Sequence, residues 1–210
     1  MSFAKTFQKA ILAGIAISLG GYVFLNVGGL TGAVLFTFGL LTVVHYQLAL
    51  FTGKAGYFNS CKSIATLFTA ILFGNVVGCF LVALLAWPQV TDLTSIQEAA
   101  IKLVDGRLNA GYGPNFILAI PCGFIMTTAV EFGRQQKFLP LLFGVPLFIM
   151  CGFRHSIADA FYYLAANNIS LQLILTWVVI VIGNFIGCNL YRLILLDEVI
   201  KSKNAEENND

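Results

Sequence analysis

Ionisable side chains interrupt the apolar stretches of this sequence at only a few positions. The densest group is Arg154, His155 and Asp159, in the middle of an apolar block, whereas Lys54 and His45 stand alone in another. A charge at the centre of a bilayer costs about 2.5 to 3.5 kcal/mol on insertion scales, so such residues usually serve a function. Histidine can offer a neutral N–H and exchange a proton near neutral pH. We expect His155 to act on a solute, with a histidine satisfied by neighbouring helices as the alternative, and we expect His45 to be structural.

The charged neighbours of His155 allow two roles. Arg154 and Asp159 lie five residues apart, a spacing that suits a break followed by a helix start, and we expect Asp159 to pair with Arg154. Such a pair serves either as a scaffold for the break or as a direct attraction for an anion. Glu131 and Arg134 are spaced for an interfacial ion pair. Lys54 either attracts anions at the inner mouth of a pore or helps to set the orientation of the chain in the membrane.

The composition explains why these residues are exceptional. Of the 210 residues, 58% are hydrophobic and 10% are charged, against about 25% charged in soluble domains. The apolar residues form six blocks of the length that crosses a bilayer as helix, at about 8–28, 30–50, 63–87, 113–132, 138–164 and 170–195. We therefore predict an all-α integral membrane protein with six transmembrane helices. Residues 1–200 form one transmembrane pore domain in this prediction, and 201–210 form a disordered cytoplasmic tail.

The same counts exclude other classes of protein. A formal net charge of +2 is too small for binding nucleic acid. The five cysteines lie in or beside apolar segments, so we expect neither a disulfide framework nor a metal site. The basic residues of the connections lie on one side of the membrane, which places both termini in the cytoplasm. Residues 94–104 begin with an N-cap and have helical apolar spacing, so we predict a short external helix at the membrane surface.

An internal repeat divides the chain into two halves. Gly74-Asn-Val-Val-Gly-Cys79 in the third block matches Gly183-Asn-Phe-Ile-Gly-Cys188 in the sixth. Halves of three spans each insert with opposite topology, which is the inverted-repeat design of many transport proteins. The alternative is chance recurrence of the G-x-x-x-G strings that serve close helix packing.

Blocks two and five correspond in this repeat, and both are interrupted. The glycines and lysine of Leu50–Tyr57 break the second block, and Cys151–Ser156 breaks the fifth. Non-helical backbone at membrane depth is tolerated only where it is buried in protein or lines a wet cavity. We therefore predict that broken helices 2 and 5 face each other across a pore.

Three strings in order resemble motifs of the formate/nitrite transporter family. Gly152-Phe-Arg-His-Ser-Ile-Ala-Asp-Ala-Phe161 is similar to the G-F-E-H-S-I-A-N-M-F signature of the family's broken fifth helix. Leu50-Phe-Thr52 resembles the L-F-T of its broken second helix, and the paired G-N-x-x-G strings match its third and sixth helices. The resemblance covers nearly all of residues 8–195. It implies an aquaporin-like fold, a homopentamer and one pore per protomer for small monovalent anions, in a bacterial inner (plasma) membrane.

The resemblance also implies roles for individual residues. His155 corresponds to the pore histidine, with Thr52 as its hydrogen-bonding partner, and Arg154, Asp159 and Lys54 belong to the substrate pathway. Four residues correspond to the apolar constrictions: Phe36, Leu40, Leu50 and Phe148. The chain departs from the pattern at Arg154, where the family usually has Glu, and at Asp159, where it usually has Asn. These two changes add a net charge of +1 beside the histidine and should favour an anion.

The sequence thus predicts a passive or proton-coupled pore for small anions of weak acids, with no enzyme activity and no cofactor. Formate, nitrite and hydrosulfide are equal alternatives, because all are small, monovalent and conjugate to weak acids. A channel for small neutral solutes such as water or glycerol is the second hypothesis, with Arg154 as the charge that excludes cations. A membrane-embedded enzyme or a structural partner protein is the third, and no nucleophile–base set or metal-ligand spacing supports it.

Overall fold

The computed structural model describes residues 2–57, 60–91 and 94–195, and all regular secondary structure in these ranges is helical. The predicted tail, residues 201–210, lies outside the described residues. Four helices are long and apolar enough to cross a membrane: Phe3–Val27, Cys61–Ala86, Tyr112–Arg134 and Leu171–Cys188. Two further apolar helices, Gly29–His45 and Leu139–Met150, are shorter.

The first half of the chain places a break after its second long helix. Helix α1 (Phe3–Val27) is followed by α2 (Gly29–His45), and residues 46–50 then separate α2 from the single turn α3 (Phe51–Lys54). The long apolar helix Cys61–Ala86 is continuous but changes its winding along its length. It comprises α4 (Cys61–Thr66), a π-helical turn (Leu67–Leu72), α5 (Phe73–Ala83) and a 3-10 turn (Leu84–Ala86).

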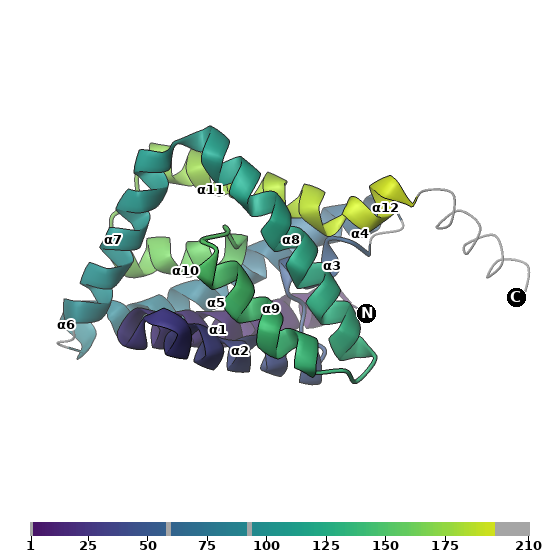
Figure 1. The fold of residues 1–210 in the computed structure, drawn as a ribbon, viewed down its shortest axis with the longest axis horizontal. Helices are drawn as coiled ribbons and strands as arrows, with labels where there is room; N and C mark the ends of the chain where they lie inside the picture. The colour runs from purple at the N-terminus through teal and green to yellow at the C-terminus, as the bar shows by residue number, and fades with distance from the viewer. Residues whose placement is uncertain (1, 58–59, 92–93, 196–210) are drawn as a thin grey trace, which may run out of the picture.

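The second half begins with two helices, α6 and α7, and then repeats the arrangement. Its elements are α6 (Pro88–Thr91), α7 (Thr94–Ala110), α8 (Tyr112–Arg134), α9 (Leu139–Met150), α10 (Ser156–Ala166), α11 (Leu171–Cys188) and α12 (Leu190–Ile194). Helix α7 confirms the helix predicted over residues 94–104 and extends it to Ala110. It lies across the end of the molecule opposite the N-terminus (Figure 1) and buries Ile96, Ala100 and Val104.

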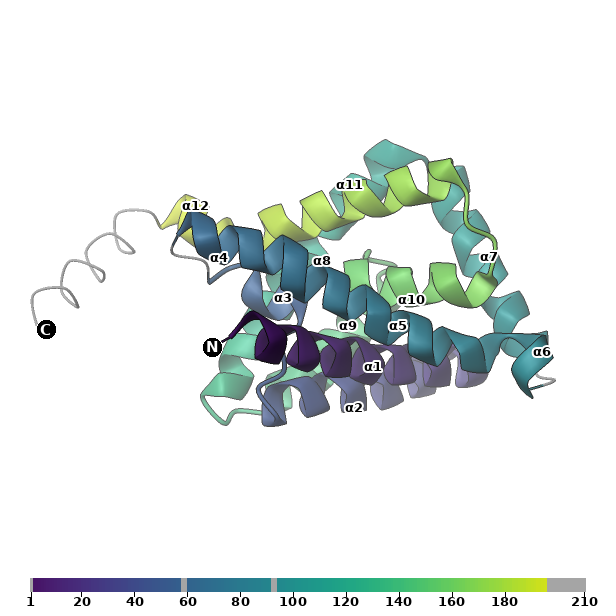
Figure 2. The same cartoon turned by 180° about the vertical axis from the view of Figure 1, so that it is seen from behind.

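The two halves pack in matching ways. Helix α1 contacts α2 and α5, and α8 makes the corresponding contacts with α9 and α11; Figures 1 and 2 show the short α3 and α10 enclosed between these groups. The repeat glycines allow the close approach. A Cβ at Gly78 would overlap the Ile11 carbonyl of α1, and one at Gly187 would overlap the Ile120 carbonyl of α8. The predicted repeat is therefore also a repeat of helix contacts.

The asparagine of the first repeat string holds the first break. Asn75 Oδ1 accepts the N–H of Phe51 at 2.9 Å, and its Nδ2 donates to the carbonyl of Ala49 at 2.9 Å and to that of Ala10 at 2.8 Å. Breaking a helix frees backbone donors and acceptors that must be satisfied inside the protein. One buried side chain satisfies the groups on both sides of Leu50.

The asparagine of the second string does the same in the other half. Asn184 Oδ1 accepts the N–H of Ser156 at 2.7 Å, and its Nδ2 donates to the carbonyls of Arg154 and Ala119, both at 2.8 Å. The residue between the two clamped groups is His155. Leu50 of the first half and His155 of the second therefore occupy equivalent positions.

The first break lies closer to the N-terminus than predicted. The glycines of Leu50–Tyr57 were expected to interrupt the helix, but Phe51–Lys54 is a helical turn and the non-helical residues are 46–50. Helix α2 ends because Gln47 adopts a left-handed conformation, with φ of 50°. Gly56 serves close packing instead, since a Cβ there would lie 2.6 Å from the Cys188 carbonyl.

Candidate functional site

His155 ends the connection between α9 and α10, and its ring is held at both nitrogens. Nδ1 accepts the backbone N–H of Ala158 at 3.1 Å, which makes His155 the N-cap of α10. Nε2 lies 3.1 Å from Oγ1 of Thr52 in α3. Because Nδ1 is an acceptor, the proton of the neutral ring belongs on Nε2, and we assign Nε2–H as the donor to the threonine hydroxyl.

The surroundings of His155 favour this neutral form. The side chain is buried, and the Phe148 ring stacks on the imidazole with 5.4 Å between ring centroids. A second proton on Nδ1 would break the cap with Ala158 and would add positive charge at the positive end of the α10 dipole. The site thus presents an uncharged N–H donor inside the protein.

Thr52 is positioned by helices from the other half of the chain. Its backbone carbonyl accepts the Thr127 hydroxyl at 3.4 Å and lies 3.3 Å from the Cys188 thiol. The corresponding cysteine of the first half, Cys79, lies 3.4 Å from the Ile157 carbonyl. Each broken segment is therefore tied to its own half by an asparagine and to the other half by a cysteine.

An apolar layer contains Phe148, whose ring stacks on the histidine. Its members are the four predicted constriction residues, each at most 3% exposed: Phe36, Leu40, Leu50 and Phe148. Phe36 meets Phe148 edge to face, with ring centroids 6.0 Å apart. The structure thus places one predicted constriction residue, Phe148, directly against His155 and a second, Phe36, against Phe148.

Two cavities are lined by members of this layer, one by Leu50 and the other by Phe148. The basic-end cavity has a volume of about 580 Å³ and reaches Leu50 from the end of the molecule that holds the N-terminus. The α7-end cavity, of about 110 Å³, lies beside His155 and is also lined by Phe148. The two cavities share no lining residue. The hydrogen bond between Thr52 and His155 joins the two broken segments, α3 and the connection between α9 and α10.

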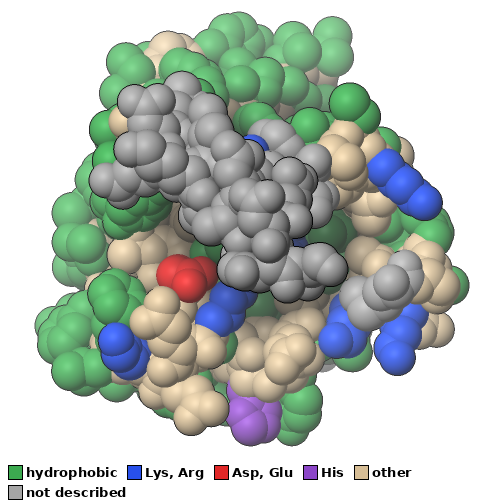
Figure 3. All heavy atoms as spheres, turned by 90° about the vertical axis from the view of Figure 1, so that its right-hand side faces the viewer, with side chains coloured by type: hydrophobic (Ala, Val, Ile, Leu, Met, Phe, Trp, Pro, Cys, Tyr) green, Lys and Arg blue, Asp and Glu red, His purple; other side chains and the backbone are tan. Residues whose placement is uncertain are grey.

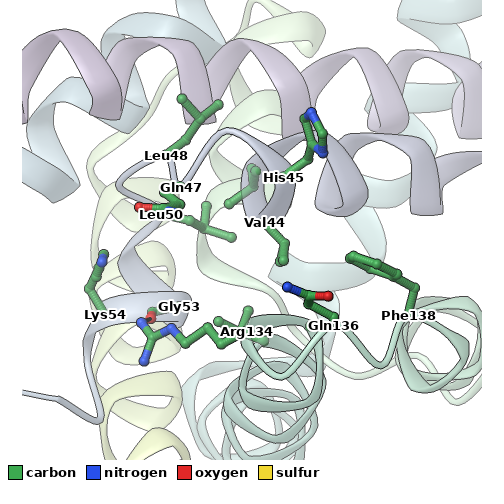
Figure 4. A pocket seen from close by; sticks show the side chains of 13 residues that line it. Val44, His45, Gln47, Leu48, Leu50, Gly53, Lys54, Arg134, Gln136 and Phe138 are labelled. Carbon is green, nitrogen blue, oxygen red and sulfur yellow. Dashed lines mark hydrogen bonds between the residues drawn. The ribbon is translucent and has the colours of Figure 1, made fainter.

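Basic side chains gather at the N-terminal end of the molecule (Figure 3). Lys54 and Arg134 both line the basic-end cavity, where Figure 4 shows them on the same side. Two uncharged amides, Gln47 and Gln136, and the ring of His45 also line it. No carboxylate is among the described residues that line this cavity, so its wall carries net positive charge.

Arg134 is anchored by three kinds of contact. Its Nη2 donates to the Gly53 carbonyl at 3.1 Å, and its guanidinium carbon lies 3.9 Å from the centroid of the Tyr57 ring. Its Nη1 lies 3.7 Å from Oε2 of Glu131, so the predicted ion pair is present. The Tyr57 hydroxyl donates to the same carboxylate at 2.6 Å. These contacts fix the side chain to both α3 and α8.

The predicted pairing of Asp159 with Arg154 is wrong. Asp159 Oδ1 instead accepts a hydrogen bond from Nε of Arg107, at 3.1 Å, and Asp159 is only 1% exposed. Asp159 lies in the first turn of α10, which packs against α7, so its carboxylate meets the last turn of the external helix. Burial alone would lower the pKa of Arg107, but the adjacent carboxylate raises it above its ordinary value.

Arg154 makes its contacts with neutral groups. Its Nε donates to Oδ1 of Asn115 at 2.8 Å, and its Nη1 donates to the Gly152 carbonyl at 2.7 Å. Its backbone N–H donates to the Leu118 carbonyl of α8 at 3.1 Å. The arginine therefore ties the break to the start of α8. Sequence reasoning missed Asn115 and Arg107, although a polar residue near the start of an apolar span was a signal for the first.

The described residues contain no group of three or more His, Cys, Asp or Glu side chains that could hold a metal ion. The five cysteines are free thiols: Cys79, Cys122 and Cys188 are buried, and Cys61 and Cys151 are exposed.

Comparison with known sequences finds relatives among transporters and channels. The chain is 29% identical over 167 residues to the uncharacterised transporter YrhG of Bacillus subtilis, an alignment that covers 67% of this chain and 59% of that protein. It is 27% identical over 183 residues to the formate channel FocA of Escherichia coli K12, covering 75% and 64% respectively. The chain thus spans about six-tenths of the length of these relatives.

Comparison with solved structures finds the same fold. A pentameric formate channel with formate bound matches with a TM-score of 0.82 and 20% identity, covering 94% of this chain and 97% of that one. An ion channel of the FNT family matches with a TM-score of 0.76 and 19% identity, covering 90% and 87%. The sequence model described as formate/nitrite transporter matches residues 1–170. This integral membrane protein therefore belongs to the formate/nitrite transporter family, whose members are transporters and channels rather than enzymes.

Proposed function

We propose that this protein is a pore for small monovalent anions of weak acids, of the formate, nitrite or hydrosulfide class, and that His155 is its central hydrogen-bond donor. The observation that carries the proposal is the position of His155, whose Nε2, assigned as the donor, is held against Thr52 at the wall of the α7-end cavity. The family membership and the formate channels among the relatives support the same class of solute.

The apolar layer supports a transport mechanism that depends on the uncharged acid. Moving a bare anion between apolar side chains such as Leu40 and Phe36 forfeits its hydration, which is very costly. The free-energy cost of losing hydration is much smaller for a weak acid in its neutral form. An N–H donor at His155 offers a hydrogen bond in the driest part of the path, where such a bond is strong.

The charged residues of the pathway have separate roles in this proposal. Lys54 and Arg134 make the basic-end cavity attractive to anions and raise their concentration at Leu50. Arg154 holds the second break in shape through Asn115 and the Gly152 carbonyl. Asp159 balances Arg107 at the opposite end.

We propose a homopentamer in a bacterial inner membrane, with both termini in the cytoplasm. The pentameric formate channel among the structural neighbours supports the oligomer. Helix α1 begins and α12 ends at the same end of the molecule (Figure 1), and Lys and Arg side chains gather at that end (Figure 3). This agrees with a cytoplasmic location for that end. Native mass spectrometry would measure the oligomer number directly.

The proposal is tested by measuring uptake of labelled formate into proteoliposomes at several pH values. His155→Asn and His155→Phe should abolish pH-dependent uptake, because neither side chain can both donate at this position and exchange a proton near neutral pH. His45→Asn is the matched control, since His45 is exposed at the wall of the basic-end cavity. It should leave the pH profile unchanged.

Two outcomes would reject the proposal. Unchanged formate uptake and pH profile in both His155 variants would remove the role of the histidine. Faster osmotic equilibration with glycerol or urea than with sodium formate would instead indicate a channel for neutral solutes.

A further inference from the structure

The α7-end cavity contains an ion pair in which one oxygen is unused. Asp159 lines the cavity together with Arg107 and His155. Its Oδ1 accepts from Arg107, but Oδ2 is buried and has no hydrogen-bond partner among the described residues. A buried carboxylate oxygen without a donor is unfavourable, so its presence beside a cavity indicates that a donor arrives from outside the chain.

Donor groups surround the same position. Within the described residues the guanidinium of Arg107 makes one hydrogen bond, through Nε, which leaves its Nη groups available. The hydroxyl of Tyr163, one helical turn beyond Asp159 on the same face of α10, is also buried without a partner. The region therefore offers one free acceptor and several free donors.

These groups select among kinds of ligand. A bare anion has only acceptors, so it would bring negative charge against Oδ2 of Asp159. A cation would suit that oxygen, but Arg107 and Arg154 repel it. The lining charges, Arg107 and Asp159, sum to zero, so the cavity favours an uncharged molecule that carries a donor beside an acceptor.

The volume of the α7-end cavity limits which ligands fit. A water molecule occupies about 30 Å³ in the liquid, and the cavity has about 110 Å³. It therefore has room for a molecule of a few heavy atoms, and the aromatic rings of Phe148 and Tyr162 complete its wall.

We propose that the α7-end cavity binds the protonated, uncharged form of a small oxyacid, whose O–H donates to Asp159 Oδ2 and whose second oxygen accepts from Arg107. This deepens the proposed function, on which it rests, by naming the protonation state and the substrate class. Formic and nitrous acids have a donor beside an acceptor oxygen. Hydrogen sulfide has no such oxygen and should be a poorer substrate.

The titratable groups facing Asp159 are those of the elements packed around it. Arg107 comes from α7, Cys122 from α8, Arg154 and His155 from the break, and Tyr162 and Tyr163 from α10 itself. A change in pH dependence on mutating Asp159 must therefore be read beside the His155 variants.

The test compares formate with nitrate in proteoliposomes. Nitrate is planar and similar in size to formate, but it is the conjugate base of a strong acid and brings no proton. The unmodified protein should carry formate faster as the pH falls and should reject nitrate. Asp159→Asn should lower the formate-to-nitrate flux ratio by about tenfold or more, the worth of a hydrogen bond to a charged acceptor.

A control variant, a replacement variant and a spectroscopic measurement accompany the flux-ratio test. Asp105→Asn makes the same chemical change at an exposed carboxylate of α7, and it should leave the ratio unchanged. If Asp159→Asn does not assemble, the double variant Arg107→Gln/Asp159→Asn, which leaves neither charge of the pair behind, replaces it and should show the same loss. Infrared spectra of bound ¹³C-formate should show the C=O band of the uncharged acid in the unmodified protein and not in the variant.

An unchanged ratio in the variant that assembles would overturn this proposal, as would nitrate flux equal to formate flux in the unmodified protein. If a water molecule, rather than the acid, bridges Asp159 and Arg107, the formate-to-nitrate flux ratio should be unchanged in the variant. Formate uptake and a pH profile that are unchanged in both His155 variants would overturn the proposed function itself. The two failures are therefore distinguishable.

Discussion

Asn184 offers the sharpest test of how the broken helices are held. Its amide makes three buried hydrogen bonds, of 2.7 to 2.8 Å, to backbone groups on α8 and on both sides of His155. Truncation to alanine leaves these three groups unsatisfied. Each unsatisfied backbone group costs about 1 to 3 kcal/mol. Because water that enters the new space restores part of this free energy, Asn184→Ala should destabilise the protein by about 3 to 5 kcal/mol.

Asn75→Ala is the matched variant, because Asn75 makes the corresponding three hydrogen bonds around Leu50. Thermal unfolding in detergent should show similar losses for the two variants. Their transport should differ. Asn184 positions the N–H donor, so its loss should change the pH dependence of formate flux per folded protein, whereas the loss of Asn75 displaces only an apolar side chain.

Two results would refute this reasoning. An unfolding midpoint for Asn184→Ala equal to that of the unmodified protein would mean that the three hydrogen bonds contribute little. Identical pH profiles for the two asparagine variants would mean that the amide of Asn184 does not control the geometry of the histidine.

The effects of four further substitutions are predicted from local geometry. Gln136→Gly should stabilise the protein by about 0.5 to 1 kcal/mol in thermal unfolding, because Gln136 has φ of 60°. Gly187→Ala should weaken the contact of α8 with α11 and lower the unfolding midpoint, whereas Gly106→Ala, where a Cβ meets nothing within 4 Å, should raise it. Arg107→Ala should cost about 3 to 5 kcal/mol, because it leaves the carboxylate of Asp159 buried and unpaired; a loss below about 1 kcal/mol would contradict the burial of the pair.

The parts of the fold that depend on local pattern could be predicted from the sequence. The repeated G-N-x-[VI]-G-C strings indicated the two matching halves, and the structure shows why these residue types recur. Gly187 admits a backbone carbonyl of α8, and Asn184 satisfies the break. The second break was placed correctly because Arg154 and His155 could not face lipid.

The errors concern contacts between distant residues. Asp159 was paired with Arg154 because sequence spacing shows only local neighbours, whereas its partner, Arg107, lies 52 positions earlier on α7. The first break was placed at Gly53 and Gly56 because glycine is common at interruptions. Helix α2 ends earlier, at a left-handed glutamine, and nothing in the residue type of Gln47 marks such a conformation.

The equivalence of Leu50 and His155 has a consequence for direction. A pore built from two inverted halves has nearly the same backbone whether it is entered from one compartment or the other. The barrier nevertheless has two different faces, since a leucine stands where the other half carries an imidazole. In the proposed function, an acid that enters from the basic end meets Leu50 first and His155 afterwards, and an acid moving in the opposite direction meets them in reverse order. The symmetry of the backbone therefore does not make inward and outward passage equivalent.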